Sequence, residues 1–209
     1  MSSPPDTTPS PPPSKKRATL TRLLKEARQA FSEKGVAGAK VEDIARAAGV
    51  TKQLVYHYFN SKEQLFVSVL DESMQEVLAD LLALELDHLS PTDALRALLR
   101  HVFDLFRSDP TRGSLTHESS RFHEHNEGYP KRIADLSPIL INTMSRILQR
   151  GAASGEFVPE VDAKMFCTAA ILMATSGFTN RYIASSVTGF DTMDPEGMVV
   201  WQAFATDFV

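Results

Sequence analysis

The sequence predicts an all-α protein of about nine helices, in which a small N-terminal three-helix unit precedes a larger helical body. Apolar residues recur at helical spacing along most of the 209 residues, and no stretch alternates apolar and polar residues as a strand would. Gly and Pro residues separate the periodic stretches. We expect residues 1–17 to form a tail, residues 18–64 the small unit, and residues 65–209 the body.

The N-terminal stretch differs from the rest in composition. Residues 1–14 hold six of the twelve prolines, together with Ser and Thr, and lack the apolar core of a signal peptide. We therefore expect a disordered, partly polyproline-II tail that ends in a basic arm.

The first helix is predicted over residues 19–34, where apolar residues form one stripe. Gly35 is expected to end it, since glycine readily takes the left-handed conformation found there. The second helix begins near Lys40, and Ala39 in front of it cannot cap it, at a cost of roughly 1 kcal/mol. The members of the first stripe are Leu20, Leu23, Leu24, Ala27, Ala30 and Phe31.

Two short helices around a glycine follow. Residues 41–48 place apolar side chains on one face, Gly49 permits a sharp turn, and Thr51 can cap the next helix with its hydroxyl. That helix, residues 51–58, turns Leu54 and Val55 inward. This arrangement is a helix-turn-helix motif, which lays its second helix in the major groove of DNA.

The same window resembles a known family. Residues 44–65 read I-A-x-A-A-G-V-T-K-x-x-x-Y-H-Y-F-x-S-K-E-x-L, which is similar to the DNA-binding domain of the TetR family of bacterial transcriptional repressors. The close resemblance covers roughly residues 20–70, whereas the remainder is similar in length and helical character only. Where the family usually has a capping Thr, this chain has Ala39.

The resemblance implies which side chains contact DNA. By their chemistry, Lys52 suits a guanine edge or a phosphate and Gln53 suits an adenine edge, while Tyr58 is expected to pack inside. Lys62 follows the capping residue Ser61, where its charge opposes the helix dipole, and a DNA phosphate would relieve that conflict. The implied DNA-binding residues are Thr51, Lys52, Gln53, Tyr56, His57 and Lys62.

Charge is distributed unevenly along the chain. The net charge is −4, yet residues 15–62 carry 11 Lys and Arg against four acidic residues, a net +7, whereas residues 63–209 carry −10. A basic head on an acidic body suits a protein that presents one end to phosphates. The run Lys15-Lys16-Arg17 is either an arm that touches DNA or a solvated charge run, and the sequence leaves both open.

Six further helices are predicted. The first of them is long and joins the head to the body. Ser90-Pro91 separates this helix from the next one, and Asp109-Pro110 separates that one from a shorter helix. The loop 126–130 then precedes the seventh helix of the chain. The predicted ranges are 62–87, 92–107, a shorter helix ending near 124, 131–153, 159–186 and 195–209.

The last two predicted helices carry an unusual amount of small and apolar surface. The resemblance implies a homodimer in which these helices, about 160–186 and 195–209, form a symmetric four-helix interface with the partner. Alternatively, the same stripes fill the core of a single protomer. The residues concerned are Ala169, Ala170, Met173, Ala174, Gly177, Phe178, Met198, Trp201, Phe204, Ala205 and Phe208.

Enzymatic and metal chemistry find little support. His117-Glu118 would begin a zinc-protease motif, but residue 121 is Arg where that motif has its second His, and no phosphate-binding loop or G-x-S-x-G is present. We expect no catalytic residue, metal or cofactor. No run of 18 apolar residues suggests a membrane span, and the single Cys167 is compatible with a reducing cytoplasm.

Residues 112–127 concentrate polar and charged side chains. They either supply polar anchors of an effector pocket in the body or form a polar surface helix. The candidates for the pocket are His117, Arg121 and Asn180 as polar groups, with Phe103, Met144 and Met173 as apolar lining.

Together these features predict a ligand-responsive repressor in the bacterial cytoplasm, associated with the nucleoid. It would bind a palindromic double-stranded operator as a homodimer and be released by a small-molecule effector of unknown identity. The alternative is a DNA-binding structural or interaction protein that recruits a protein partner without any effector.

Overall fold

The computed structural model describes residues 15–130 and 133–207, and these residues form helices without any strand. The all-α prediction is confirmed. The ten helices are α1 (Lys15–Gly38), α2 (Val41–Ala47), α3 (Lys52–Phe59), α4 (Lys62–Leu82), α5 (Pro91–Ser108), α6 (Thr111–His125), α7 (Ile133–Ser154), α8 (Ala163–Thr179), α9 (Arg181–Thr188) and α10 (Pro195–Asp207).

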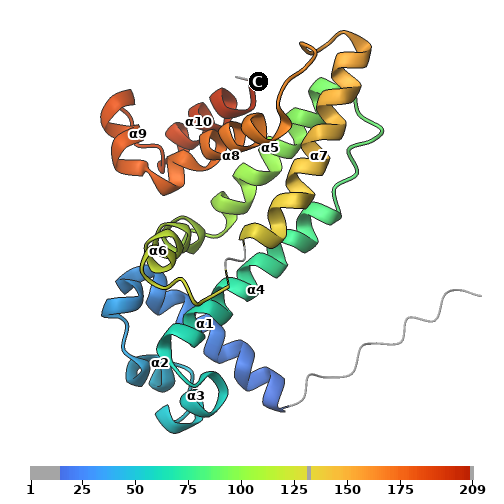
Figure 1. Ribbon diagram of the computed structural model, residues 1–209. Coiled ribbons are helices and arrows are strands. Elements are labelled where there is room, and N and C mark those ends of the chain that lie inside the picture. Colours follow the sequence, from blue (N-terminus) through green and yellow to red (C-terminus); the bar gives the residue numbers. More distant parts are fainter. Residues whose placement is uncertain (1–14, 131–132, 208–209) are drawn as a thin grey trace, which may run out of the picture.

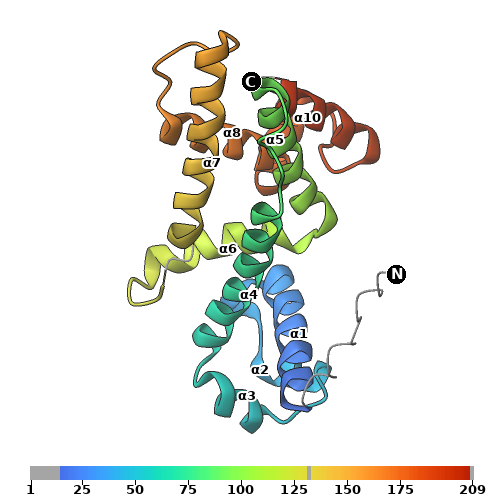
Figure 2. The same cartoon turned by 90° about the vertical axis from the view of Figure 1, so that its right-hand side faces the viewer.

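The helices form a small head and a larger upper body (Figure 1). Helices α1, α2 and α3 lie at the lower end, and α4 runs upward from them to meet α7. Helix α5 packs against α7, α8 and α10 in the body. Helix α6 crosses between the two parts, as the view in Figure 2 also shows.

The head is held together by the stripe that the sequence predicts on its first helix. Leu23, Ala27 and Phe31 of α1 are fully buried, and they pack with Ile44 of α2 and Val55 of α3. Because helices this short are not stable alone in water, burial of these apolar faces is what holds α2 and α3 in place.

Helix α6 completes the core of the head. Phe66 of α4 lies between two rings, with its centroid 5.2 Å from that of Phe31 in α1 and 5.1 Å from that of Phe122 in α6, both in edge-to-face contact. Leu115 of α6 is buried in the same cluster. Edge-to-face aromatic pairs add about 0.5–1.5 kcal/mol beyond the burial of their area. The core of the head therefore extends beyond residues 18–64 into α6.

A hydrogen bond joins α6 to the turn after α1. Gly35 has φ +65° and ψ 174°, which ends the regular helix where the sequence predicts. The next backbone N–H, that of Val36, donates to Glu118 Oε1 of α6 at 2.7 Å. A Cβ at position 35 would lie 3.0 Å from the Glu118 carboxylate, so this approach and the positive φ both favour glycine.

The body has a core of its own. Leu98 and Leu99 of α5 pack with Met144 and Ile147 of α7, and the partly buried side of α4 covers them. Small residues let α8 approach its neighbours closely. A Cβ added at Gly177 would lie 2.9 Å from the Trp201 ring of α10.

Because of this close packing, part of the predicted dimer surface lies inside the protomer, and that part of the prediction is wrong. Ala170, Ala174, Gly177 and Ala205 are buried inside the protomer, because α8 packs on α5 and α10 of its own chain. Phe208 lies outside the described residues. The large exposed apolar side chains of α8 and α10 are Met165, Leu172, Val199, Val200 and Phe204, and the predicted interface residue Ala169 is exposed as well.

Several helix boundaries differ from the predicted ones, and α8 begins at Ala163 instead of near residue 159. Helix α1 already begins at Lys15, and α4 ends at Leu82 because the following turn buries Leu86 in the body core. The helix predicted over residues 159–186 is two helices, α8 and α9, so the described residues contain ten rather than about nine. They separate at Asn180, whose φ of −125° and ψ of 36° are not helical. Asn competes for backbone hydrogen bonds and disfavours helix interiors.

Candidate nucleic-acid interface

The turn between α2 and α3 is fixed by local sequence. Gly49 adopts φ +67°, and the N–H of Val50 donates to the carbonyl oxygen of Ala45 at 2.9 Å. Thr51 caps α3, because its Oγ1 accepts the N–H of Leu54 at 3.2 Å. Both roles were predicted from the sequence, and both are confirmed. By contrast, Lys40 at the start of α2 makes no side-chain cap.

Helix α3 has one buried face and one exposed face. Val55 and Phe59 anchor it in the head core, and Tyr58 is half-buried against the same cluster, as predicted. The five candidate DNA-contacting residues of this segment all lie on the exposed face: Thr51, Lys52, Gln53, Tyr56 and His57. Their exposure leaves them free to meet base edges, and their contact with DNA stays a prediction.

An ion pair occupies the start of the exposed face. The Lys52 ammonium lies 2.5 Å from Glu42 Oε1 of α2 and 5.6 Å from the centre of the Tyr56 ring. The hydrogen bond from Lys52 lowers the pKa of Glu42, and the same contact raises the pKa of Lys52. Both side chains are about half exposed, at 50% and 52%, so solvent screens the pair and its effect on stability is small.

Lys62 binds backbone carbonyls of the protein itself, which differs from the prediction. The sequence suggested that a DNA phosphate would relieve the conflict between its charge and the dipole of α4. In the structure, Lys62 Nζ donates to the carbonyl oxygens of Ala37 and Ala39 at 3.3 Å each, at the end of α1. These carbonyls already relieve the conflict, so Lys62 also ties α4 to α1. Ser61 caps α4 as predicted, since its Oγ accepts the N–H of Gln64.

A hollow of about 460 Å³ brings several of these side chains together. Tyr56 and Lys62, both predicted to bind DNA, line it with Lys40 and Glu42. Lys40 is exposed and was not among the residues predicted from the sequence. The sequence feature that could have indicated Lys40 is its position directly in front of α2, in a head with a net positive charge.

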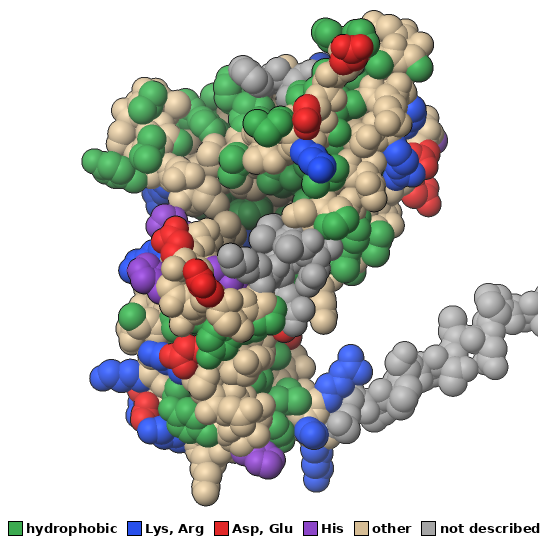
Figure 3. All heavy atoms as spheres, viewed as in Figure 1, with side chains coloured by type: hydrophobic (Ala, Val, Ile, Leu, Met, Phe, Trp, Pro, Cys, Tyr) green, Lys and Arg blue, Asp and Glu red, His purple; other side chains and the backbone are tan. Residues whose placement is uncertain are grey.

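The basic run forms the first turn of α1 instead of a flexible arm. Lys15, Lys16 and Arg17 are helical, and Thr19 Oγ1 donates to the Lys15 carbonyl oxygen at 2.9 Å. Lys16 Nζ lies 5.8 Å from the centre of the Tyr58 ring, which places this turn beside α3. Basic side chains are visible at this lower end of the molecule in Figure 3.

The six effector candidates do not converge. His117 and Arg121 are exposed on α6, and Asn180 is exposed between α8 and α9. Phe103 is buried against the Phe178 ring, with centroids 4.9 Å apart. Of the other two, Met144 lies in the core between α5 and α7, whereas Met173 is half-buried beside Val102 and Ala205.

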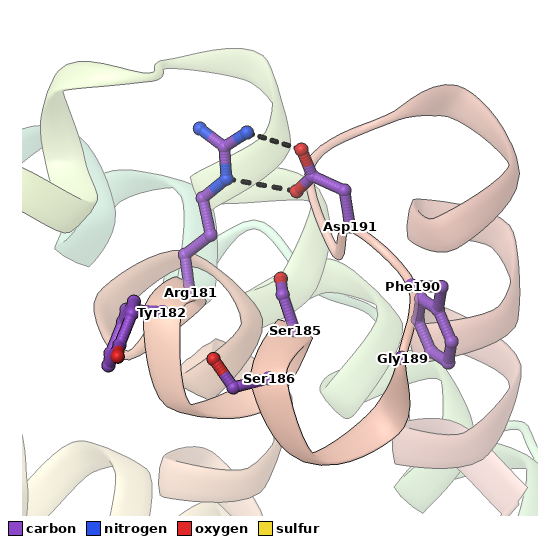
Figure 4. A pocket seen from close by; sticks show the side chains of 7 residues that line it. All are labelled: Arg181, Tyr182, Ser185, Ser186, Gly189, Phe190 and Asp191. Carbon is purple, nitrogen blue, oxygen red and sulfur yellow. Dashed lines mark hydrogen bonds and ion pairs between the residues drawn. The ribbon is translucent and has the colours of Figure 1, made fainter.

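A second hollow, of about 520 Å³, lies on α9 and contains none of these six residues (Figure 4). Arg181 and Asp191 pair across it through two hydrogen bonds, and the pairing lowers the pKa of Asp191. Tyr182 and Phe190 lie on opposite sides of it. Its charged groups therefore satisfy each other.

Metal ligation and membrane insertion find no counterpart in the described part of the chain. It holds no cluster of three or more His, Cys, Asp or Glu side chains placed to bind a metal ion. None of its helices combines the length and the apolar character needed to cross a membrane.

Family comparisons match both parts of the chain. Residues 23–69 match the family described as "Bacterial regulatory proteins, tetR family", and residues 91–209 match "Tetracyclin repressor-like, C-terminal domain". The first range holds the helix-turn-helix, and the second holds the helices from α5 to α10.

Individual proteins are similar over most of their length. The HTH-type transcriptional repressor NicS of Pseudomonas putida is 28% identical over 193 residues, which cover 90% of this chain and 89% of NicS. The fatty acid degradation regulator FadR of Bacillus halodurans shares the fold, with a TM-score of 0.68, 21% identity, and coverage of 92% and 97%. FadR of Bacillus subtilis, in complex with stearoyl-CoA, has a TM-score of 0.61, 18% identity, and coverage of 90% and 98%.

The basic first turn of α1 gives a test by salt dependence. Replacing Lys15 and Lys16 with Gln should weaken binding to duplex DNA and make log K fall less steeply with log salt. If both contact phosphates, the slope should drop by about 1.8 units per bound subunit, because each phosphate contact contributes about 0.9. Fluorescence anisotropy at several salt concentrations measures this slope.

The matched control replaces Arg100 and Arg146, two exposed arginines of the body, with Gln. It removes the same charge far from α3 and should leave the slope unchanged. Equal slopes for the α1 variant and the unaltered protein would show that the first turn of α1 stays in solvent.

Proposed function

The chain belongs to the TetR family of bacterial regulatory proteins, and on that premise we propose that it is a ligand-responsive transcriptional repressor that binds its operator as a homodimer. The observation that carries the proposal is the exposed face of α3, which a buried core presents at the basic end of the molecule. Its relative NicS carries the name of a repressor.

Binding to DNA would use α3 as the recognition helix. Its first residues would enter the major groove, where the N-terminal part of such a helix meets base edges. Gln53 and His57 would face bases, while Lys40, Lys62 and the first turn of α1 would approach phosphates on either side. These backbone contacts would set the register of the protein on the duplex.

A homodimer would place two such helices on successive turns of one DNA face, about 34–36 Å apart. The exposed apolar faces of α8 and α10 support this arrangement. Leu172 of α8 is 62% exposed, and Val199 and Phe204 of α10 are 67% and 48% exposed. Side chains of this size gathered on neighbouring helices mark an interaction surface. A two-fold interface would let each copy cover the other.

The effector would act from the body on the head. One structure of the same fold, FadR of Bacillus subtilis, holds stearoyl-CoA, which supports a small-molecule effector here. We propose residues 65–209 as the effector-binding and dimerisation part, with α4 and α6 both reaching the head. An effector shifts DNA affinity only as far as it binds one arrangement of α4 and α6 better than another.

A second candidate function is recruitment of a protein partner while bound to DNA. It is favoured by α9, where Tyr182 is 84% exposed, Ile183 62% and Val187 81%. An operator affinity that no metabolite changes, together with a protein bound to α9, would favour this function over effector control.

Selection of bound duplexes from a random pool tests the proposed function. The selected sites should be palindromic. Tyr56→Ala should weaken binding to the selected site about tenfold, because it removes one contact of the recognition helix, while circular dichroism and the dimer mass stay the same. Recovery of sites without two-fold symmetry, or of no preferred site, would contradict a dimeric operator-binding repressor.

Leu172→Glu tests the dimer surface. A carboxylate placed in an apolar interface loses its hydration, so this variant should sediment as a monomer and lose operator binding. Leu82→Glu is the control, since Leu82 is 66% exposed at the end of α4, away from α8 and α10. Analytical ultracentrifugation separates the two states, and a dimeric Leu172→Glu variant would exclude this face as the interface.

A further inference from the structure

The ion pair at the start of α3 has a donor and an acceptor side by side. Lys52 is the first residue of α3, and its ammonium lies 2.5 Å from Glu42 Oε1. Glu42 also lines the same hollow as Tyr56 and Lys62. The Glu42 carboxylate therefore lies on the surface that would face DNA. It is next to the Lys52 ammonium on that surface.

A carboxylate on this surface needs an explanation. The other acid in the first turn of α2, Asp43, pairs with Arg46 on its own helix at 3.1 Å. Glu42 instead pairs with a residue of the recognition helix. Close to DNA, a carboxylate is repelled by phosphates, and a hydrogen bond that it accepts from the duplex offsets this repulsion. In the major groove, Asp and Glu accept a hydrogen bond from the N4 amino group of cytosine.

The two charged groups keep free hydrogen-bonding capacity while paired. An ammonium has three donors, and a carboxylate has about four acceptor sites. Their contact uses one of each. The pair can therefore bind further groups without separating.

A G·C base pair presents the matching pattern. In the major groove, guanine offers the O6 and N7 acceptors, and cytosine offers its N4 amino donor. Guanine O6 and cytosine N4 are themselves hydrogen-bonded, so they lie about 3 Å apart. Lys52 matches guanine O6 or N7 as a donor, and Glu42 matches cytosine N4 as an acceptor.

We propose that Glu42 and Lys52 act as a unit that reads one G·C base pair in each half-site of the operator. Lys52 donates to guanine O6 or N7, and Glu42 accepts from cytosine N4. Glu42 is thus a specificity-determining residue supplied by α2, outside the recognition helix. This inference rests on the proposed function, since it requires a sequence-specific site.

The test uses the selected operator and the full-length protein. Each G·C pair of the half-site is replaced by A·T in turn, in both half-sites, and affinity is measured by anisotropy at one salt concentration. The unaltered protein should lose about tenfold or more at one position. Glu42→Ala should lose most of that discrimination there and keep it at all other positions. The double variant Glu42→Ala/Lys52→Ala should discriminate no less than Lys52→Ala alone.

A base analogue addresses the atom itself. N4-methylcytosine at the assigned position removes the free major-groove donor while the pairing hydrogen remains. It should weaken binding by the unaltered protein and have little effect on Glu42→Ala. Asp43→Ala is the matched control, because it removes the neighbouring acid from the same turn of α2 and should leave every ratio unchanged.

Three results would overturn the inference. Glu42→Ala could strengthen binding to every duplex by one factor with all ratios unchanged, which would make Glu42 only a repulsive charge. The selected half-site could lack any G·C position at which Glu42→Ala and Lys52→Ala reduce the discrimination against A·T. If the unaltered protein selects no site at all, the proposed function fails together with this inference.

Discussion

Contact between three aromatic rings governs how this protein presents α3, the proposed recognition helix. Phe66 of α4 packs edge-to-face against Phe31 of α1 and Phe122 of α6, and all three are nearly or fully buried. Since α2 and α3 are too short to be stable alone, they depend on the core that these rings close. The exposed face of α3 is thus held in place partly by a helix that follows it by some 50 residues in the chain.

Polar contacts surround this core and join the same helices. Arg28 of α1 and Arg112 of α6 both bind Glu76 of α4, at 3.0 and 3.2 Å, and both lie within 3.6 Å of Asp109, which precedes α6. The two arginine side chains are only 16% and 10% exposed. Removing one member would leave a partly buried charge without its partner, which is costly. A movement of α6 would therefore disturb α1 and α4 together. Under the proposed function, this is a route by which an effector in the body changes the spacing of the two heads.

Local features of the sequence predicted local features of the structure. The glycine at position 49, the cap at Thr51 and the stripe through Leu23 and Phe31 each depend on residues a few positions apart, and each was predicted correctly. The exposed face of α3 was predicted from the same helical periodicity. The break at Asn180 was missed because the apolar pattern continues through it.

What the sequence could not predict depends on residues far apart in the chain. Lys62 binds the carbonyls of Ala37 and Ala39, and Glu118 accepts the N–H of Val36, because folding brings these segments together. The pairing of Glu42 with Lys52 is of the same kind. The candidates at His117, Arg121 and Asn180 came from residue type and position along the chain, and neither determines which side chains converge in the fold.

Native-state hydrogen exchange of the unaltered protein tests most directly whether α6 belongs to the core of the head. The amides of Phe31 in α1 and Phe122 in α6 should exchange with the same opening free energy, because one aromatic cluster buries both side chains and cooperative units open together. If the amide of Phe122 exchanges through a much easier opening while that of Phe31 stays protected, α6 is not part of the head, and the recognition helix does not depend on it.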